Sequence, residues 1–186
     1  MRMPVIASLV LAFVGASARA ADSYAVDDMH TAVTFKVSHI GLSWVYGRFN
    51  DVSGTFTIDA DASKSSFALT IKTESVDTGN KKRDQHLQSP DFFDVKQYPA
   101  IVFKSTSVKA IDGGLEVTGD LTLHGTTKAV TFALKGGNKA EFPKGVQRTG
   151  YSTELSLKRS DFGMDKMTNM IGDEVYIAIS FEGTKK

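Results

Sequence analysis

Apolar and polar residues alternate along most of the chain after Ala21, with the two-residue period of strands that have one buried and one solvated face. The first clear case is Val33, Phe35 and Val37, which are separated by polar residues. Seven further segments repeat the pattern, at 52–58, 67–71, 101–103, 115–123, 130–134, 151–157 and 175–181. A short stretch at 23–27 could add a ninth strand. The pattern therefore predicts an all-β antiparallel fold with eight main strands.

Eight alternating strands can form either a sandwich or a barrel, and periodicity does not separate the two. We favour a barrel because every strand has one apolar face, and hairpin turn signals separate neighbouring strands. An eight-stranded barrel is just wide enough to be filled by side chains or to hold one small ligand. Gly54 and Gly119 lie in phase with the apolar face. They either leave space for a ligand or relieve strain where a strand bends.

Two stretches break the alternation and are longer than ordinary hairpin loops, at 73–99 and 159–173. The first contains a segment with helical composition, from about residue 80 to residue 88, which Pro90 ends. We therefore expect one short helix in a long loop.

Three basic residues, Lys81, Lys82 and Arg83, occupy the first turn of this predicted helix. The helix dipole disfavours cations at that position, so they are candidates for binding an anionic head group at the barrel mouth. The alternative is a solvated charged face in which Arg83 pairs with Asp84.

The long stretches also carry large apolar side chains outside any periodic pattern. Phe92 and Phe93 are expected to cap one end of the barrel or to project into its mouth. Met164, Met167 and Met170 recur every three residues and predict either an adaptable apolar lid or ordinary core packing.

Aromatic residues also cluster ahead of the strand at 52–58. Trp44, the single tryptophan, is followed by Tyr46 and Phe49. Core packing is the simplest explanation for this group, with ligand stacking as the alternative.

The N-terminus has the features of a secretory leader. Arg2 provides a basic start, an apolar run spans residues 5–16, and Ala18-Arg19-Ala20 is a typical cleavage site. We expect residues 1–20 to be a signal peptide cleaved after Ala20, and residues 21–186 to be one domain in the periplasm. No later segment approaches the ~20 apolar residues of a membrane-spanning helix, so no stable membrane insertion is expected.

Composition excludes several function classes. The chain has 22 basic and 21 acidic residues, and loss of Arg2 and Arg19 would change its net charge from +1 to −1. Such a balance disfavours nucleic-acid binding. The chain has no cysteine, which excludes thiol chemistry and cysteine-based metal sites.

No recognisable catalytic or metal-binding motif is present. His30, His39, His86 and His124 are widely spaced and show no paired-ligand pattern, so no metal site is predicted. The chain also lacks a nucleophile elbow, a dinucleotide-binding glycine motif and a phosphate loop. Catalytic residues and cofactors are therefore not expected.

With these segments in place, the chain resembles the YceI-like family of bacterial periplasmic proteins along residues 23–183. The resemblance rests on motifs whose order and spacing are specific together. These are Asp28-Met29-His30, Val33-x-Phe35-x-Val37-x-His39, Gly47-x-Phe49, Gly54-x-Phe56, Arg83-Asp84-Gln85-His86-Leu87, Phe92-Phe93-Asp94, Tyr98-Pro99, Gly119-Asp120-Leu121-Thr122-Leu123-His124-Gly125, Arg159-x-Asp161-Phe162-Gly163-Met164 and Ile171-Gly172-Asp173-x-Val175.

The resemblance implies a lipocalin-like eight-stranded barrel that binds long isoprenoid chains, such as a polyprenyl phosphate or the tail of a quinone, without catalytic residues. We expect a carrier or reservoir whose inward positions line an apolar tube. The expected lining residues are Val33, Phe35, Val37, Phe56, Phe67, Leu69, Phe103, Leu121, Phe132, Leu155 and Ile177.

Two alternatives stay open at this stage. One is an enzyme that acts on an isoprenoid lipid or quinone, with Asp84 and His86 as acid–base candidates. The other is a stress-response interaction protein with a filled barrel. Homodimer formation, the identity of the lipid, and storage as opposed to transport are not decided by the sequence.

Overall fold

The computed structural model describes residues 20–186, so the predicted leader lies outside the described residues apart from Ala20. The strands are β1 (Asp22–His39), β2 (Ser43–Phe49), β3 (Val52–Ile58), β4 (Ser66–Lys72), β5 (Val76–Asp77), β6 (Ala100–Ile111), β7 (Gly114–Leu123), β8 (Thr126–Glu141), β9 (Gln147–Lys158) and β10 (Ile171–Lys185). The helical segments are α1 (Lys81–Leu87) and the 3₁₀ turns η1 (Ala62–Lys64), η2 (Thr73–Ser75) and η3 (Arg159–Phe162).

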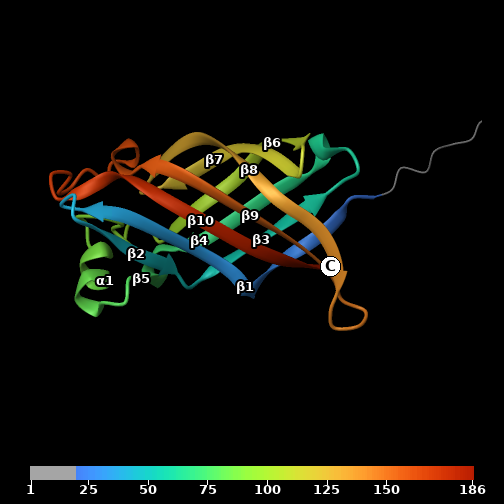
Figure 1. The fold of residues 1–186 in the computed structure, drawn as a ribbon, viewed down its shortest axis with the longest axis horizontal. Coiled ribbons are helices and arrows are strands. Elements are labelled where there is room, and N and C mark those ends of the chain that lie inside the picture. The colour runs from blue at the N-terminus through green and yellow to red at the C-terminus, as the bar shows by residue number, and fades with distance from the viewer. Residues whose placement is uncertain (1–19) are drawn as a thin grey trace, which may run out of the picture.

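The strands close into an antiparallel barrel, because β10 pairs with β1 as well as with β9 (Figure 1). Two positions in the barrel wall are each occupied by two short strands placed end to end. β3 and β2 pair with the first and second halves of β1, and β4 and β5 pair with β3 and β2. The wall is therefore eight strands wide, and the predicted all-β eight-stranded barrel with one helix is confirmed.

Two local features of the strands differ from the alternation pattern. The segment at 23–27 is not a separate strand but the first half of β1, which changes register between Asp27 and Ala32. β2 was not predicted. Its inward positions are Val45, Gly47 and Phe49, and the glycine hides the alternation. A side chain at Gly47 would collide with Phe35, because an added Cβ would lie 2.3 Å from the Phe35 ring.

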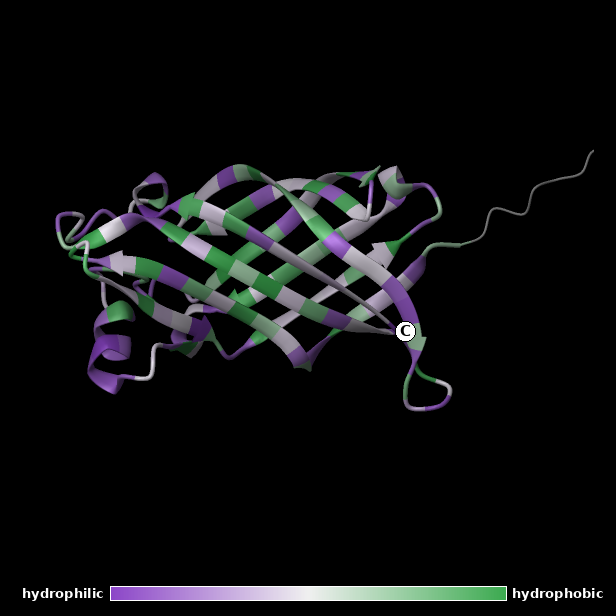
Figure 2. Ribbon diagram, viewed as in Figure 1, coloured by the Kyte–Doolittle hydropathy of each residue, from purple (hydrophilic) through white to green (hydrophobic). Residues whose placement is uncertain are grey.

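Inward residues of neighbouring strands lie side by side in the wall as register partners. Phe35 faces Ile177 and Val37 faces Val175 between β1 and β10, while Leu155 faces Ile177 between β9 and β10. Figure 2 shows the resulting alternation of hydrophobic and hydrophilic residues along the strands. Burial of the inward set is what stabilises a chain without disulfides.

An aromatic core fills one half of the barrel. Phe56 is 1% exposed, and its ring lies 5.0 Å from Tyr24, 5.6 Å from Phe67 and 5.5 Å from Phe181, measured between centroids. The buried members of this core are Tyr24, Phe56, Phe67, Phe103, Val108, Val117, Leu134, Tyr151 and Phe181. This half leaves little room for a ligand.

The inward glycines leave no cavity in this region. An added Cβ at Gly119 would lie 2.5 Å from the Phe103 ring, and one at Gly54 would lie 2.9 Å from the Leu69 side chain. Backbone carbonyls of the neighbouring strands are as close or closer, Ala68 O at 2.3 Å from the Cβ added at Gly54 and Lys104 O at 2.5 Å from that at Gly119, so neither glycine leaves space for a ligand.

The opposite end of the barrel is covered by the two long stretches that interrupt the alternation. α1, the β1–β2 turn and the 159–171 segment gather there, while the β8–β9 turn and the C-terminus lie at the far end (Figure 1). Asn80 caps α1, and its side chain accepts a hydrogen bond from the Arg83 backbone N–H at 3.1 Å. Among residues 20–186, no helix is long and apolar enough to cross a membrane.

Candidate functional site

A cavity of about 960 Å³ occupies the half of the barrel that the aromatic core does not fill. Its strand-borne walls come from β1, β2, β6, β7, β9 and β10, at the ends of these strands nearest α1. Its aliphatic and aromatic lining residues are Val33, Phe35, Val37, Trp44, Val45, Tyr46, Phe49, Leu87, Phe92, Phe93, Ile101, Leu123, Leu157, Met164, Met167, Ile171, Val175 and Ile177. The site is thus a deep apolar pocket with one closed end.

The barrel wall is interrupted beside this cavity. β2 pairs with β5 only through Arg48 and Phe49, so within residues 20–186 its segment 43–47 has no strand partner on that side. The loop that carries α1 lies beside this gap and contributes Thr78 and Asn80 to the cavity wall. Exposed residues of both elements border the cavity, Trp44 and Tyr46 on β2 and Lys82 and Arg83 on α1, so the cavity opens to the outside between β2 and α1.

Four of the eleven predicted lining residues border the cavity, namely Val33, Phe35, Val37 and Ile177. Six others belong to the filled half: Phe56, Phe67 and Phe103 are in the aromatic core, and Leu69, Leu121 and Phe132 pack against it. Leu155 is half-buried on β9, opposite Ile177. The apolar face is continuous, but only one end of it is hollow.

The head-group candidates divide in a similar way. Lys82 and Arg83 border the cavity, whereas Lys81 does not. Arg83 is held in place by Thr78, because its Nε donates to the Thr78 hydroxyl and its Nη2 to the Thr78 carbonyl, both at 2.7 Å. The Asp84 carboxylate also accepts from the backbone N–H of Thr78, at 2.9 Å. The expected Arg83–Asp84 pair is therefore replaced by a shared contact with Thr78.

His86 stands at the same opening, but it pairs with a different acid from the one considered above. Its Nε2 lies 3.1 Å from Asp91 Oδ2, and this contact lowers the pKa of Asp91. Its ring meets the edge of Phe92 at 5.0 Å. The structure does not bring His86 and Asp84 together as an acid–base pair.

Phe92 and Phe93 both face the cavity from the long loop. Phe92 is 6% exposed, and Phe93 packs edge-on against Phe49 with centroids 5.5 Å apart. These residues therefore cover the end of the barrel and also line the pocket, so the two expected roles coincide.

Arg159 is a buried cation at the cavity wall that the sequence analysis did not select. It is 5% exposed, and its guanidinium donates to the carbonyls of Met164 at 2.7 Å, Ile171 at 2.9 Å and Gly172 at 3.0 Å. Burial lowers the pKa of Arg159, although a guanidinium remains charged in proteins. Arg159 thus ties together the two ends of residues 163–170, which we call the methionine loop.

The methionines of this loop take different positions. Met164 is 6% exposed and packs with Leu123 and Phe162, while Met164 and Met167 border the cavity. Met170 is 41% exposed. Part of the series is core and part is cavity wall. Leu157 and Val175 were also missed as lining residues. They were detectable as the last inward position of the strand before this loop and the first apolar inward position of the predicted strand after it.

The aromatic cluster expected near β2 does not form. Phe49 points into the barrel, whereas Trp44 and Tyr46 are 44% and 64% exposed and border the cavity at its opening. Trp44 meets Tyr176 edge-on at 5.5 Å, and Lys36 Nζ lies 4.9 Å from the Trp44 ring centroid. Core packing was therefore the wrong explanation for Trp44, and ligand stacking at the cavity stays a prediction.

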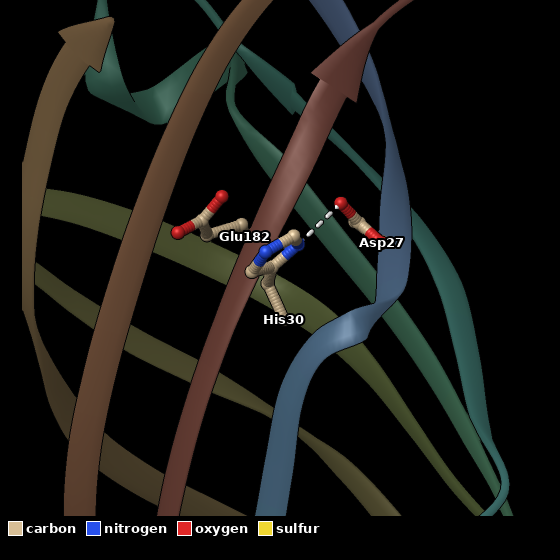
Figure 3. A group of neighbouring side chains, drawn as sticks. All are labelled: Asp27, His30 and Glu182. Carbon is tan, nitrogen blue, oxygen red and sulfur yellow. Dashed lines mark hydrogen bonds and ion pairs between the residues drawn. The ribbon is translucent and has the colours of Figure 1, made fainter. Parts of the chain in front are cut away.

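A separate group of metal-ligand residue types lies outside the cavity. In residues 20–186, Asp27, His30 and Glu182 place their ligand atoms within 4.8 Å of one another (Figure 3). Arg148 already pairs with both carboxylates, and its Nη1 lies 3.2 Å from Glu182 Oε2. The hydrogen bonds from Arg148 and His30 lower the pKa of Asp27 to about 2. The guanidinium supplies the positive charge here, which makes this an ion-pair network.

Together, the closed barrel and its one-ended apolar pocket define a lipocalin-like class of protein, an eight-stranded barrel with an apolar cavity inside it. Residues 24–183 match the YceI-like domain family. The chain belongs to this YceI-like family.

Relatives and solved structures agree with that assignment. The chain is 41% identical to protein YceI of Escherichia coli O17:K52:H18 over 179 residues, which cover 95% of this chain and 93% of that protein. It is 41% identical to a UPF0312 protein of Ectopseudomonas mendocina, covering 97% of each. The fold matches BcnA of Burkholderia cenocepacia with a TM-score of 0.77 and 26% identity, over 84% of this chain and 98% of BcnA.

A further solved structure is described as a polyisoprenoid-binding domain from Saccharophagus degradans implicated in plant cell wall breakdown. Its TM-score is 0.66 over 88% of this chain and 98% of that domain. At 18% identity, this match supports the fold alone.

Proposed function

We propose that the protein is a periplasmic binding protein that holds one long-chain polyisoprenoid, or the isoprenoid tail of a quinone, in the hollow half of its barrel. It acts as a carrier or reservoir and has no catalytic role. The periplasmic location rests on the leader expected at residues 1–20. The observation that carries the proposal is the apolar cavity at the α1 end.

The size and lining of the cavity suit this ligand class. Its volume of about 960 Å³ is at the upper end of the ~300–1,000 Å³ typical of ligand pockets. Its wall is mostly aliphatic and aromatic, so burial of the ligand supplies the driving force. Burying several hundred Å² of hydrocarbon favours binding by roughly 10 kcal/mol before the costs of association.

Polar groups near the opening supply the selectivity that an apolar wall lacks. Lys82 and Arg83 border the cavity, and Thr78 fixes the guanidinium of Arg83 in position. A phosphate or another anionic head group therefore fits this end, with the chain pointing toward the aromatic core. The ligand class proposed for this chain is the one in the description of that structural neighbour, a polyisoprenoid-binding domain.

Organic extraction of the protein, purified from the periplasm of its native host, tests the proposal. Mass spectrometry of the extract is expected to show a long isoprenoid at about one molecule per chain. Ile177→Trp fills the cavity and should remove the lipid. Ala178→Trp is the matched control, because the neighbouring side chain is exposed on the outer surface.

The proposal fails if no lipid is recovered and added polyprenyl chains do not bind. It also fails if Ile177→Trp retains as much lipid as Ala178→Trp. Conversion of the bound lipid over time, abolished by His86→Ala, would instead indicate an enzyme.

A further inference from the structure

Three large apolar side chains are exposed at the end of the barrel where the cavity opens. Leu42 is 81% exposed, Ile40 is 48% exposed, and Met170 is 41% exposed. The Ile40 backbone N–H donates to the Met170 carbonyl at 2.7 Å, so the β1–β2 turn and the methionine loop lie side by side. We call these three residues the apolar rim. Folding alone gives no reason to expose them together.

The turn that carries the rim also departs from favourable local chemistry. The Leu42 N–H donates to the His39 carbonyl at 3.0 Å, with Ile40 at φ +45° and Gly41 at φ +71° between them. Because His39 pairs with Ser43, the connection is a three-residue loop, and the β-turn inside it has positive φ at both central residues, a type that favours asparagine or glycine at the first of them. A β-branched residue at positive φ is strained. Ile40 is therefore both strained and exposed, a combination that often marks a functional position.

Aromatic side chains form a second layer next to the rim. Trp44 and Tyr46 on β2 and Tyr176 on β10 are exposed, and the first two border the cavity at its opening. Trp44 is two residues from Leu42, which places it roughly 7 Å farther along the barrel. Tryptophan and tyrosine at this distance from an apolar tip are typical of a membrane–water interface.

Cations face the same side of the molecule. Lys36 Nζ lies over the rings of Trp44 and Tyr176, at 4.9 and 5.3 Å. Lys81 and Lys82 are exposed on α1, and no carboxylate of residues 20–186 lies within the 4.0 Å of an ion pair with either one. Their position in the first helical turn is unfavourable for the helix itself. An anionic surface would compensate for that.

We propose that this end of the barrel docks reversibly on the surface of a bilayer that contains anionic phospholipid. The apolar rim enters the acyl-chain boundary, Trp44, Tyr46 and Tyr176 lie at head-group depth, and the lysines contact lipid phosphates. This inference rests on the proposed function, because docking brings the opening between β2 and α1 to the lipid phase. The ligand then passes between bilayer and cavity without exposure of its chain to water.

Trp44 provides a direct probe, because it is the single tryptophan of the chain. The protein is mixed with vesicles of phosphatidylethanolamine and phosphatidylglycerol, and co-flotation is measured. In parallel, phosphatidylglycerol with brominated acyl chains is used to quench Trp44 fluorescence. Co-flotation and quenching are expected, with much weaker binding to phosphatidylcholine vesicles.

Two rim variants separate docking from folding. Leu42→Asp should lower vesicle binding at least about tenfold, because a buried leucine side chain is lost. Ile40→Asn should also weaken binding, while the urea midpoint stays equal or rises because asparagine suits the turn. Phe142→Asp is the control, since Phe142 is 73% exposed on the β8–β9 turn at the far end.

The proposal is overturned if the wild-type protein binds neither kind of vesicle, or if Phe142→Asp lowers binding as much as Leu42→Asp does. It is also overturned if the rim mediates a dimer in solution that Leu42→Asp dissociates while vesicles remain unbound. Isoprenoid binding in solution is measured on every variant. If the protein does not dock on vesicles but still binds isoprenoid, only the docking inference is refuted. If it docks but binds no isoprenoid, the proposed function is refuted.

Discussion

Truncation to alanine should have different main effects at two inward phenylalanines, a loss of stability at one and a loss of ligand binding at the other. Phe56 belongs to the aromatic core, and its ring lies within 6.1 Å of four other aromatic rings, centroid to centroid. Phe35 is half-buried, borders the cavity and has one ring neighbour, Phe49, at 5.7 Å. The perturbation is Phe→Ala at each position.

The expected losses of stability follow from these surroundings. Phe56→Ala removes a fully buried ring and leaves a void, which costs about 3–5 kcal/mol. Phe35→Ala removes a ring that already faces a cavity, so only part of the transfer free energy is lost, about 1–2 kcal/mol. With a urea m-value of about 2 kcal/mol/M, the midpoint falls by about 2 M for Phe56→Ala and by less than about 1 M for Phe35→Ala.

Ligand binding should show the reverse order. Phe35→Ala changes the wall that contacts the hydrocarbon chain and weakens isoprenoid binding, whereas Phe56→Ala leaves affinity close to that of the wild type. Unfolding is measured on delipidated protein, because a bound ligand raises apparent stability by mass action. If Phe56→Ala does not fold, Phe56→Leu is the milder substitute. Equal losses of stability, or loss of binding in a folded Phe56 variant alone, would refute the division into a filled and a hollow half.

Three further predictions concern the buried cation, acid stability and ligand length. Arg159→Met leaves the backbone carbonyls at both ends of the methionine loop without their hydrogen-bond donor. Urea unfolding should then show a loss of about 3 kcal/mol in the free energy of unfolding, and proteolysis of the loop should accelerate. A loss below about 1 kcal/mol would contradict the role of Arg159 in holding the loop ends together. The lowered pKa of Asp27, about 2, means that its ion pair with Arg148 stabilises the fold above about pH 4, and that this contribution is lost as pH falls toward 2. The difference in urea midpoint between wild type and Asp27→Asn should therefore shrink as pH falls from about 4 toward 2. A difference that stays constant over this pH range would contradict the prediction. Isoprenoid affinity should rise with each added isoprene unit and then level off once the cavity is full. Titration with chains of graded length measures this, and an affinity that keeps rising with chain length would contradict a closed pocket.

Alternation along the strands was enough to predict an antiparallel all-β fold and which residues point inward, while the choice of a barrel over a sandwich also needed the apolar face of every strand, the turn signals and the family resemblance. It could not show how far along the barrel axis each inward residue lies. Phe35 and Phe56 have the same local pattern, yet tilt and register place the first beside the cavity and the second in the aromatic core. Depth depends on long-range pairings such as that of β1 with β10, which no local window contains.

The site was predictable where its residues stood out from their own segment. Lys82 and Arg83 were noticed because a helix N-terminus disfavours cations, and Met164 and Met167 because of their spacing. Arg159 was missed because its role depends on carbonyls that the folded methionine loop brings to it. β2 was missed because Gly47, which makes room for Phe35, interrupts the apolar alternation.

The central claim is that one lipid chain lies in the hollow half of the barrel, at the α1 end. Photo-crosslinking with a polyprenyl phosphate that carries a diazirine on its tail tests this most directly, with the labelled residues read by peptide mass spectrometry. Labels are expected on cavity residues such as Phe93, Leu157 and Ile177, and competition with unlabelled polyprenyl phosphate should remove them. Labels confined to the outer wall, or spread through the core around Phe56, would contradict the account.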